Sequence, residues 1–149
     1  MVAGDQLTAE QAEALRTELA ELEGPRRTEV VQAIKKAREF GDLSENFEYH
    51  AAKNEQGLLE ARIRTLRARL DLAEIVERGG GDVVGIGSVV DVETDAGQTM
   101  EVEVSAVGGP GTVSPTSPLG AALLGRAVGD VVQVAAPRGA WQATVKAIR

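Results

Sequence analysis

The stretch "EFGDLSENFEYHAAKNEQG", residues 39–57, lies between two long helical patterns and decides how the chain folds. Gly41 marks a bend, since glycine is favoured where a helix ends. A short connection leaves the second helix little choice but to return along the first. The stretch therefore predicts an antiparallel helical hairpin with an acidic tip.

The first arm of this hairpin is expected from Thr8 to about Phe40. Apolar residues recur at helical spacing on one face: Leu15, Leu19, Leu22, Val30, Ile34 and Ala37. "TAEQ" at Thr8 has the pattern of a capping box, which predicts the helix start. Pro25, in "EGPRR", cannot donate its backbone amide and crowds the preceding turn, which predicts a kink or a one-residue slip.

The second arm is expected from about Glu45 to Glu77. Its apolar residues follow one another at alternating spacings of four and three: Leu59, Ile63, Leu66, Leu70 and Ala73. Ala52 lies one heptad before Leu59 and belongs to the same seam. Such a seam is typical of a coiled coil. Helices of roughly 30 residues are about 45 Å long, so the tip is expected at the end of a narrow rod.

The pattern changes at the glycine cluster "RGGGDVVGIG", residues 78–87, which predicts a linker. Residues 87–107 and 129–148 each read as two valine-rich strands around a turn, and 117–125 as a short helix capped by Ser117. The expected fold class is α+β, a helical hairpin followed by a small antiparallel sheet with one short helix. The expected domains are 1–78, with the acidic tip near 41–48, and 79–149.

Composition limits the possible functions. The net charge is -7, which argues against a protein that grips duplex nucleic acid over its whole surface. The chain has no cysteine, and His50 is its one histidine, so thiolate and histidine-rich metal sites are excluded. No apolar run reaches the roughly 20 residues that span a bilayer. We therefore expect a cytoplasmic protein without a membrane partner.

Asp42 and Glu45 are the candidate functional pair at the tip. Their spacing allows an ordinary structural role, with Asp42 as helix cap and Glu45 at the third helical position. Their position on a projecting tip favours a second use. Magnesium is often held by one or two protein carboxylates, with water and phosphates completing its shell. The pair could thus complete a site supplied mostly by another molecule.

Four cations flank the tip and are candidates for contacting RNA phosphates: Lys35, Lys36, Arg38 and Lys53. Lys35 and Arg38 are one turn apart on the same face, which suits a few phosphate contacts. The alternative is a solvated helix surface paired with acidic neighbours. Phe47 and Tyr49 could stack on a base, but at least one of them is expected to pack and hold the hairpin closed.

The residues "AREFGDLSENFEYHAAKNEQGLLEARI", 37–63, resemble the hairpin tip of bacterial Gre transcript-cleavage factors of the GreA and GreB type. "SPTSPLGAALLGRAVGDVVQV", 114–134, is similar to a stretch of the C-terminal domain in that family. The resemblance covers nearly the whole chain. It implies an N-terminal antiparallel coiled coil followed by an FKBP-like globular domain.

The resemblance also implies a function. The globular domain would dock on RNA polymerase, and the hairpin would enter the secondary channel toward the nascent RNA 3' end. Asp42 and Glu45 would help to hold a second Mg²⁺ and position water there, so that the polymerase cuts backtracked RNA. No cofactor is expected in the isolated chain, which would be a monomeric accessory factor and not an enzyme.

Three other functions stay open at this point. The first is a Gre-like secondary-channel binder that regulates or inhibits the polymerase without cleavage. The second is a peptidyl-prolyl isomerase, although Trp141 is the one aromatic residue after Tyr49 and such active sites are rich in aromatic side chains. The third is a plain coiled-coil adaptor, which would tolerate charge reversal at its tip.

Overall fold

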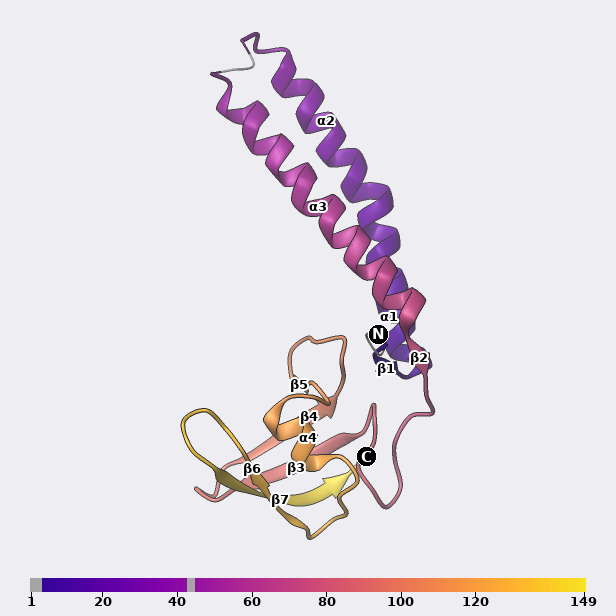
Figure 1. Ribbon diagram of the computed structural model, residues 1–149, viewed down its shortest axis with the longest axis vertical. Coiled ribbons are helices and arrows are strands. Elements are labelled where there is room, and N and C mark those ends of the chain that lie inside the picture. The colour runs from indigo at the N-terminus through magenta and orange to yellow at the C-terminus, as the bar shows by residue number, and fades with distance from the viewer. Residues whose placement is uncertain (1–3, 43–44) are drawn as a thin grey trace. The chain divides into compact units, whose positions relative to one another are not determined.

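The computed structural model describes residues 4–42 and 45–149 and divides into two compact units. One unit comprises Glu13–Leu72, and the other combines the chain up to Ala12 with Ala73–Arg149. A helical hairpin forms the first, and a mainly antiparallel sheet forms most of the second (Figure 1). The predicted fold class is confirmed.

One continuous helical arm leads to the tip and a second helix returns from it. The elements are α1 (Ala9–Glu21), a π-helical turn (Leu22–Arg26), α2 (Arg27–Arg38) and α3 (Phe47–Leu72). The π-helical turn contains Pro25 and accommodates one residue more than an α-helical turn, as the predicted one-residue slip requires. The helical arms α2 and α3 pack side by side (Figure 1).

The predicted apolar seam forms the core of the hairpin. Its buried members come from both arms: Val30, Ile34, Ala52, Leu59 and Ile63. Leu19 and Leu22, before the π-helical turn, pack against the same cluster. The seam is therefore continuous across the turn, although 22 to 30 is one residue longer than a heptad.

Ion pairs also join the two arms. Arg27 donates two hydrogen bonds to the Glu60 carboxylate, one from Nε and one from Nη2, each at 2.9 Å. Three further pairs cross between the arms: Arg26 with Glu55, Arg62 with Glu18, and Arg67 with Glu23. These side chains are partly exposed, so the pairs select the register of the arms more than they stabilise them.

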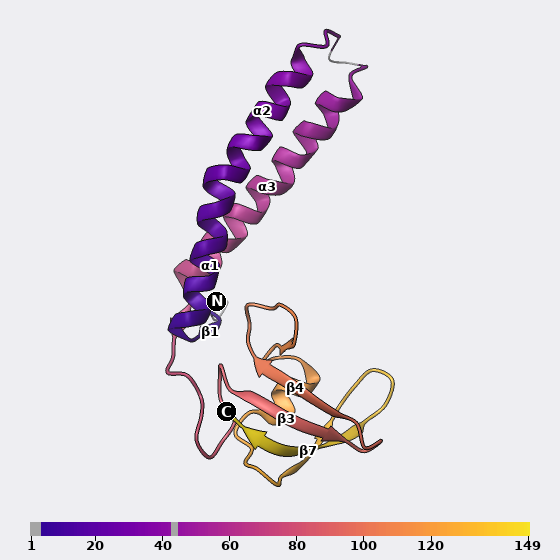
Figure 2. The same ribbon diagram turned by 180° about the vertical axis from the view of Figure 1, so that it is seen from behind.

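The second unit contains a sheet of five strands: β3 (Val89–Thr94), β4 (Thr99–Val104), β5 (Thr112–Val113), β6 (Val131–Val134) and β7 (Trp141–Ile148). The order is β5-β4-β3-β7-β6, and every pair is antiparallel except β4 with β5. Figure 2 shows β4, β3 and β7 as neighbours. Alternate residues of these strands, such as Val90 and Val92, are fully buried in one core with Leu123.

The short helix α4 (Pro118–Leu123) starts as predicted. The hydroxyl of Ser117 accepts a hydrogen bond from the Gly120 backbone N–H at 3.1 Å, and Pro118 occupies the first turn, where its missing amide costs nothing. Gly120 has no space for a side chain, because a Cβ would lie 1.9 Å from the Ser114 carbonyl oxygen.

The start of the chain is held within the sheet unit. Strand β1 (Gln6–Leu7) pairs in parallel with β2 (Glu74–Ile75), so the predicted continuation of the second helix to Glu77 is wrong. The capping box is formed: Gln11 N–H donates to Thr8 Oγ1 at 3.2 Å, and Thr8 N–H donates to Gln11 Oε1 at 3.1 Å. Gln11 Nε2 also donates to the Val104 carbonyl at 3.1 Å.

Candidate functional site

The outgoing arm ends in a basic turn just before the tip. Lys35, Lys36 and Arg38 occupy the last turn of α2, where cations interact favourably with the negative end of the helix dipole. Gly41 then adopts a φ of 101°, a conformation that residues with a side chain rarely adopt. This glycine turns the chain out of the helix and presents Asp42.

Asn46 caps the returning helix. Its Oδ1 accepts a hydrogen bond from the Tyr49 backbone N–H at 3.0 Å, as the cap residue of a helix does. Its Nδ2 donates to the carbonyl of Ala37, in the last turn of α2, at 2.6 Å. The predicted cap on Asp42, with Glu45 at the third helical position, is therefore wrong, because α3 begins five residues after Asp42, at Phe47.

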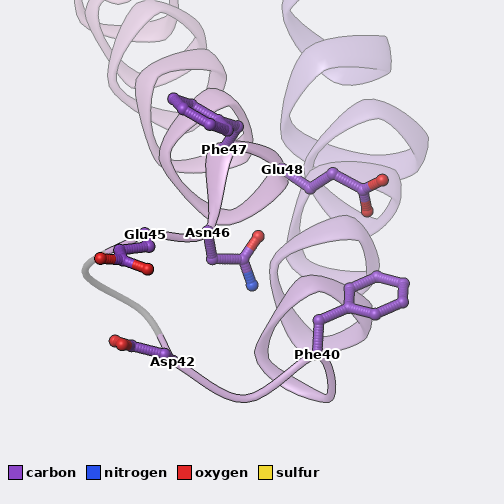
Figure 3. Close-up of a pocket in the computed structure, with 6 residues that line it drawn as sticks. All are labelled: Phe40, Asp42, Glu45, Asn46, Phe47 and Glu48. Atoms are coloured by element: carbon purple, nitrogen blue, oxygen red, sulfur yellow. The ribbon is translucent and has the colours of Figure 1, made fainter.

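The carboxylates of Asp42 and Glu45 point to the same side of the tip, away from both helices (Figure 3). Both residues are exposed, and together with Phe40, Asn46, Phe47 and Glu48 they line a hollow at the tip. Leu43 and Ser44, between them, lie outside the described residues. The cap bond to the Tyr49 N–H comes from Asn46 and not from either carboxylate.

Metal binding by the chain alone is not supported in the part that the structure describes. Across residues 4–42 and 45–149, no three His, Cys, Asp or Glu side chains are close enough to hold a metal ion. Two outward carboxylates nevertheless suit Mg²⁺, which often takes one or two protein carboxylates and completes its shell with water and phosphate. The donor set fits a site shared with another molecule.

The four candidate RNA-binding cations are exposed on both arms near the tip. The guanidinium of Arg38 lies over the Tyr49 ring, 5.9 Å from its centroid, and this contact links the two arms. Lys53 Nζ donates to Gln56 Oε1 at 3.0 Å on the same helix. All four cations remain exposed, and two of them, Arg38 and Lys53, also contact a neighbouring side chain.

The aromatic residues at the tip have opposite environments. Tyr49 is half-buried and packs against the hairpin core, and its ring meets that of His50 edge-on, with centroids 5.7 Å apart. Phe47, the other residue considered for packing at the tip, is 88% exposed and does not pack, and Phe40 is 63% exposed. Tyr49 thus holds the arms together, whereas both phenylalanines present their rings to solvent.

Asn46 is the residue at the tip that sequence reasoning missed. The signal was present, since asparagine is among the most favoured cap residues and Asn46 directly precedes a long helical pattern. The predicted cap was Asp42 instead, with Glu45 at the third helical position.

Both halves of the chain match a described protein family. Residues 5–75 match the protein family described as "Transcription elongation factor, N-terminal". Residues 79–149 match the one described as "Transcription elongation factor, GreA/GreB, C-term". The chain belongs to the GreA/GreB family of transcription elongation factors. The family resemblance of the tip sequence is thereby confirmed.

Individual relatives agree with this membership in the GreA/GreB family. The chain is 44% identical over 151 residues to "Transcription elongation factor GreA" of Thermoanaerobacter pseudethanolicus, covering 96% of each chain. It is 41% identical over 147 residues to the protein of the same name from Streptococcus suis, covering 93% of this chain and 91% of that one.

A solved structure described as that of the transcription factor Gfh1 has 34% sequence identity to this GreA/GreB family member. It covers 100% of this chain and 99% of the other, with a TM-score of 0.51. Within the described residues, no helix is both long and apolar enough to cross a membrane.

Proposed function

We propose that this elongation factor binds RNA polymerase, inserts its hairpin into the secondary channel and stimulates the polymerase's own cleavage of backtracked nascent RNA. The observation that carries the proposal is the orientation of Asp42 and Glu45, whose carboxylates face outward together while Asn46 does the capping. The chain acts as an accessory factor, and the polymerase performs the bond cleavage.

Magnesium enters this proposal as a shared ligand. Asp42 and Glu45 would hold it from the hairpin side, and the polymerase would supply the remaining ligands. In two-metal sites, such an ion stabilises the attacking and leaving oxygens of an in-line displacement. The carboxylate oxygens of this chain also accept hydrogen bonds, and so they can orient a water molecule beside the RNA.

The remaining tip residues contribute to RNA contact in this proposal. Positive charge lies on both arms near the acidic pair: Lys35, Lys36 and Arg38 precede it on α2, and Lys53 follows it on α3. Contacts of this kind position a phosphate backbone without reading its sequence. We place residues 79–149, which make up most of the sheet unit, on the polymerase as the docking domain. We expect a monomer that acts in the cytoplasm, where bacterial polymerase lies.

A backtracked elongation complex tests the proposal. The wild-type chain should shorten the nascent RNA, whereas Asp42→Asn and Glu45→Gln should bind the polymerase and lose most of the stimulation. Removing a group that stabilises charge in the transition state typically costs about 10²–10³-fold in rate. The matched control is Glu48→Gln, a neutralised carboxylate in the same hollow that points back toward α2 in Figure 3.

The outcome also separates this proposal from its main alternative. A wild-type chain that binds the polymerase and leaves the RNA intact would establish a secondary-channel regulator without cleavage. Cleavage that survives both neutralising substitutions would remove the acidic pair from the mechanism.

A further inference from the structure

The side chain of Asn46 bonds both arms of the hairpin at once. Through Oδ1 it accepts from the Tyr49 N–H at the start of α3, and through Nδ2 it donates to the Ala37 carbonyl at the end of α2. The first and last turns of a helix leave backbone groups without helical partners. One amide side chain therefore satisfies a donor on one arm and an acceptor on the other.

We propose that Asn46 is a positioning residue for RNA cleavage, because this two-ended clasp fixes where Asp42 and Glu45 stand. The proposal rests on the function proposed above. The clasp joins residue 37 to residue 46, and both carboxylates lie on the segment between them. Closing that segment at its two ends restricts the positions that its side chains can occupy.

Helix capping alone does not account for this contact. A cap needs only an acceptor, and aspartate and serine serve about as well as asparagine. Asparagine adds the Nδ2 donor. Its hydrogen bond to the Ala37 carbonyl, at 2.6 Å, is shorter than the capping bond from the Tyr49 N–H, at 3.0 Å. Ala37 O also accepts from the Phe40 N–H at 3.2 Å, so the clasp is anchored on the turn that leads into Gly41.

On the returning arm the clasp lies nearer to the acidic pair than the Arg38–Tyr49 contact does, because Asn46 directly follows Glu45. The next contacts down the hairpin are the Tyr49 ring, packed on the core and beneath Arg38, and then Ala52. Without the clasp, the part of the chain between the two arms that is not held by a contact of Asn46 would extend to Tyr49 on the returning arm. A misplacement of about 1 Å in a catalytic group can cost about 10²-fold in rate, so a small gain in freedom is enough to matter.

The substitution Asn46→Ser isolates the clasp from the cap. The serine hydroxyl can still cap α3, the net charge is unchanged, and the side chain is too short to reach Ala37. Asn46→Ala removes both functions. Asn54→Ser is the matched control, since Asn54 is exposed on α3 away from the tip.

Cleavage and polymerase binding give the first readout. For Asn46→Ser we expect cleavage at saturating factor to fall by about 10- to 100-fold, with polymerase affinity unchanged. The Mg²⁺ concentration needed for half-maximal cleavage should rise, because loosely held carboxylates hold the shared ion less well. Asn54→Ser should match the wild type in all three measurements.

Backbone ¹⁵N relaxation of the free protein gives a second readout that does not depend on activity. The amides of Asp42 and Glu45 should have order parameters that drop below about 0.6 in Asn46→Ser and stay higher in the wild type. The amide of Ala52, farther down the hairpin, should not change in either protein.

Several outcomes would overturn the positioning role. One is a cleavage rate of Asn46→Ser that equals the wild-type rate at every Mg²⁺ concentration. This result would leave the proposed function intact. Another is a loss of polymerase binding, which would make Asn46 a structural or docking residue. If the wild-type chain itself fails to cleave, the proposed function fails instead, and unchanged order parameters would then reject the clasp separately.

Discussion

At the scale of single residues, Phe47 and Tyr49 differ most in environment although they are two positions apart at the start of α3. The Tyr49 ring is packed on the hairpin core and touched by Arg38, whereas Phe47 is 88% exposed. A fully buried aromatic or aliphatic side chain stabilises a fold by about 1.5–3 kcal/mol. Only Tyr49 can contribute part of this amount in the isolated chain.

Alanine substitution at these two positions should therefore separate packing from surface exposure. Tyr49→Ala should lower the free energy of unfolding of the hairpin by roughly 1–2 kcal/mol, a part of the value for complete burial. Phe47→Ala should change it by no more than about 0.5 kcal/mol, as is usual for surface positions. Thermal unfolding followed by helical circular dichroism measures both, and equal effects would show that Phe47 packs after all.

At the scale of elements, the π-helical turn at Leu22–Arg26 corrects a mismatch in the apolar pattern. Leu15, Leu19 and Leu22 lie on one heptad phase, whereas Val30, Ile34 and Ala37 lie one residue beyond it. A π-helical turn takes in the extra residue, so both halves face α3. The turn also contains Pro25, whose ring would clash with a carbonyl in a regular α-helix.

Deleting Pro25 should consequently be tolerated and even stabilising. The deletion removes the residue that costs about 3 kcal/mol in a helix interior and restores heptad spacing from Leu22 to Val30. We expect a single uninterrupted helix, with the Tm of the hairpin at or above that of the wild type.

The control for this prediction is deletion of Gln32, an exposed residue of α2 that lies after Val30. It shortens the chain by one residue as well, but it turns Ile34 and Ala37 away from the seam and should lower the Tm strongly. If the two deletions destabilise the hairpin equally, the π-helical turn does not act as a register adjustment.

The elements that could be predicted well are those in which the apolar pattern repeats over many residues. The seam of α3 and the paired strands around residues 95–98 and 135–140 follow from apolar spacing and turn residues. The strands β1, β2 and β5 have two residues each, too few to establish a period. Strands β1 and β2 exist because the start of the chain meets residues 74–75, and β5 exists because residues 112–113 add to the edge of β4, and spacing alone encodes neither pairing.

The same distinction explains the outcome at the candidate site. That two carboxylates belong to the tip could be predicted from the bend alone. The residue that caps α3 was predicted wrongly, because the Asp42–Glu45 spacing fits a capping pattern as well as Asn46 does. The choice depends on the donor that Asn46 sends across to Ala37, a contact between two arms that only the folded hairpin provides.

At the scale of the whole molecule, each unit contains a carboxylate whose pKa an arginine lowers. A hydrogen bond from Arg27 holds the pKa of Glu60 in the hairpin below its ordinary value. Hydrogen bonds from Arg149 do the same for Asp91 in the sheet. A carboxylate with a lowered pKa in the folded state contributes stability above its unfolded pKa and loses it as pH falls through the folded pKa.

Both units should therefore become less stable on acidification below about pH 4, the range of unfolded carboxyl groups. Glu60→Gln should reduce this dependence for the hairpin only, and Asp91→Asn for the sheet unit only. Trp141, the one tryptophan, reports the sheet unit by fluorescence, and circular dichroism reports the helices. If neither variant changes the slope of Tm against pH, these pairs do not contribute to acid unfolding.

The dependence of the tip on one asparagine has a chemical consequence over time. Asparagine side chains hydrolyse slowly to aspartate, which keeps an oxygen for Tyr49 but has no hydrogen to give Ala37. Protein stored for long periods should therefore lose RNA cleavage in proportion to deamidation at Asn46, measured by peptide mass spectrometry, while its helices stay intact. The lifetime of the factor would then be set by the ageing of a single amide group.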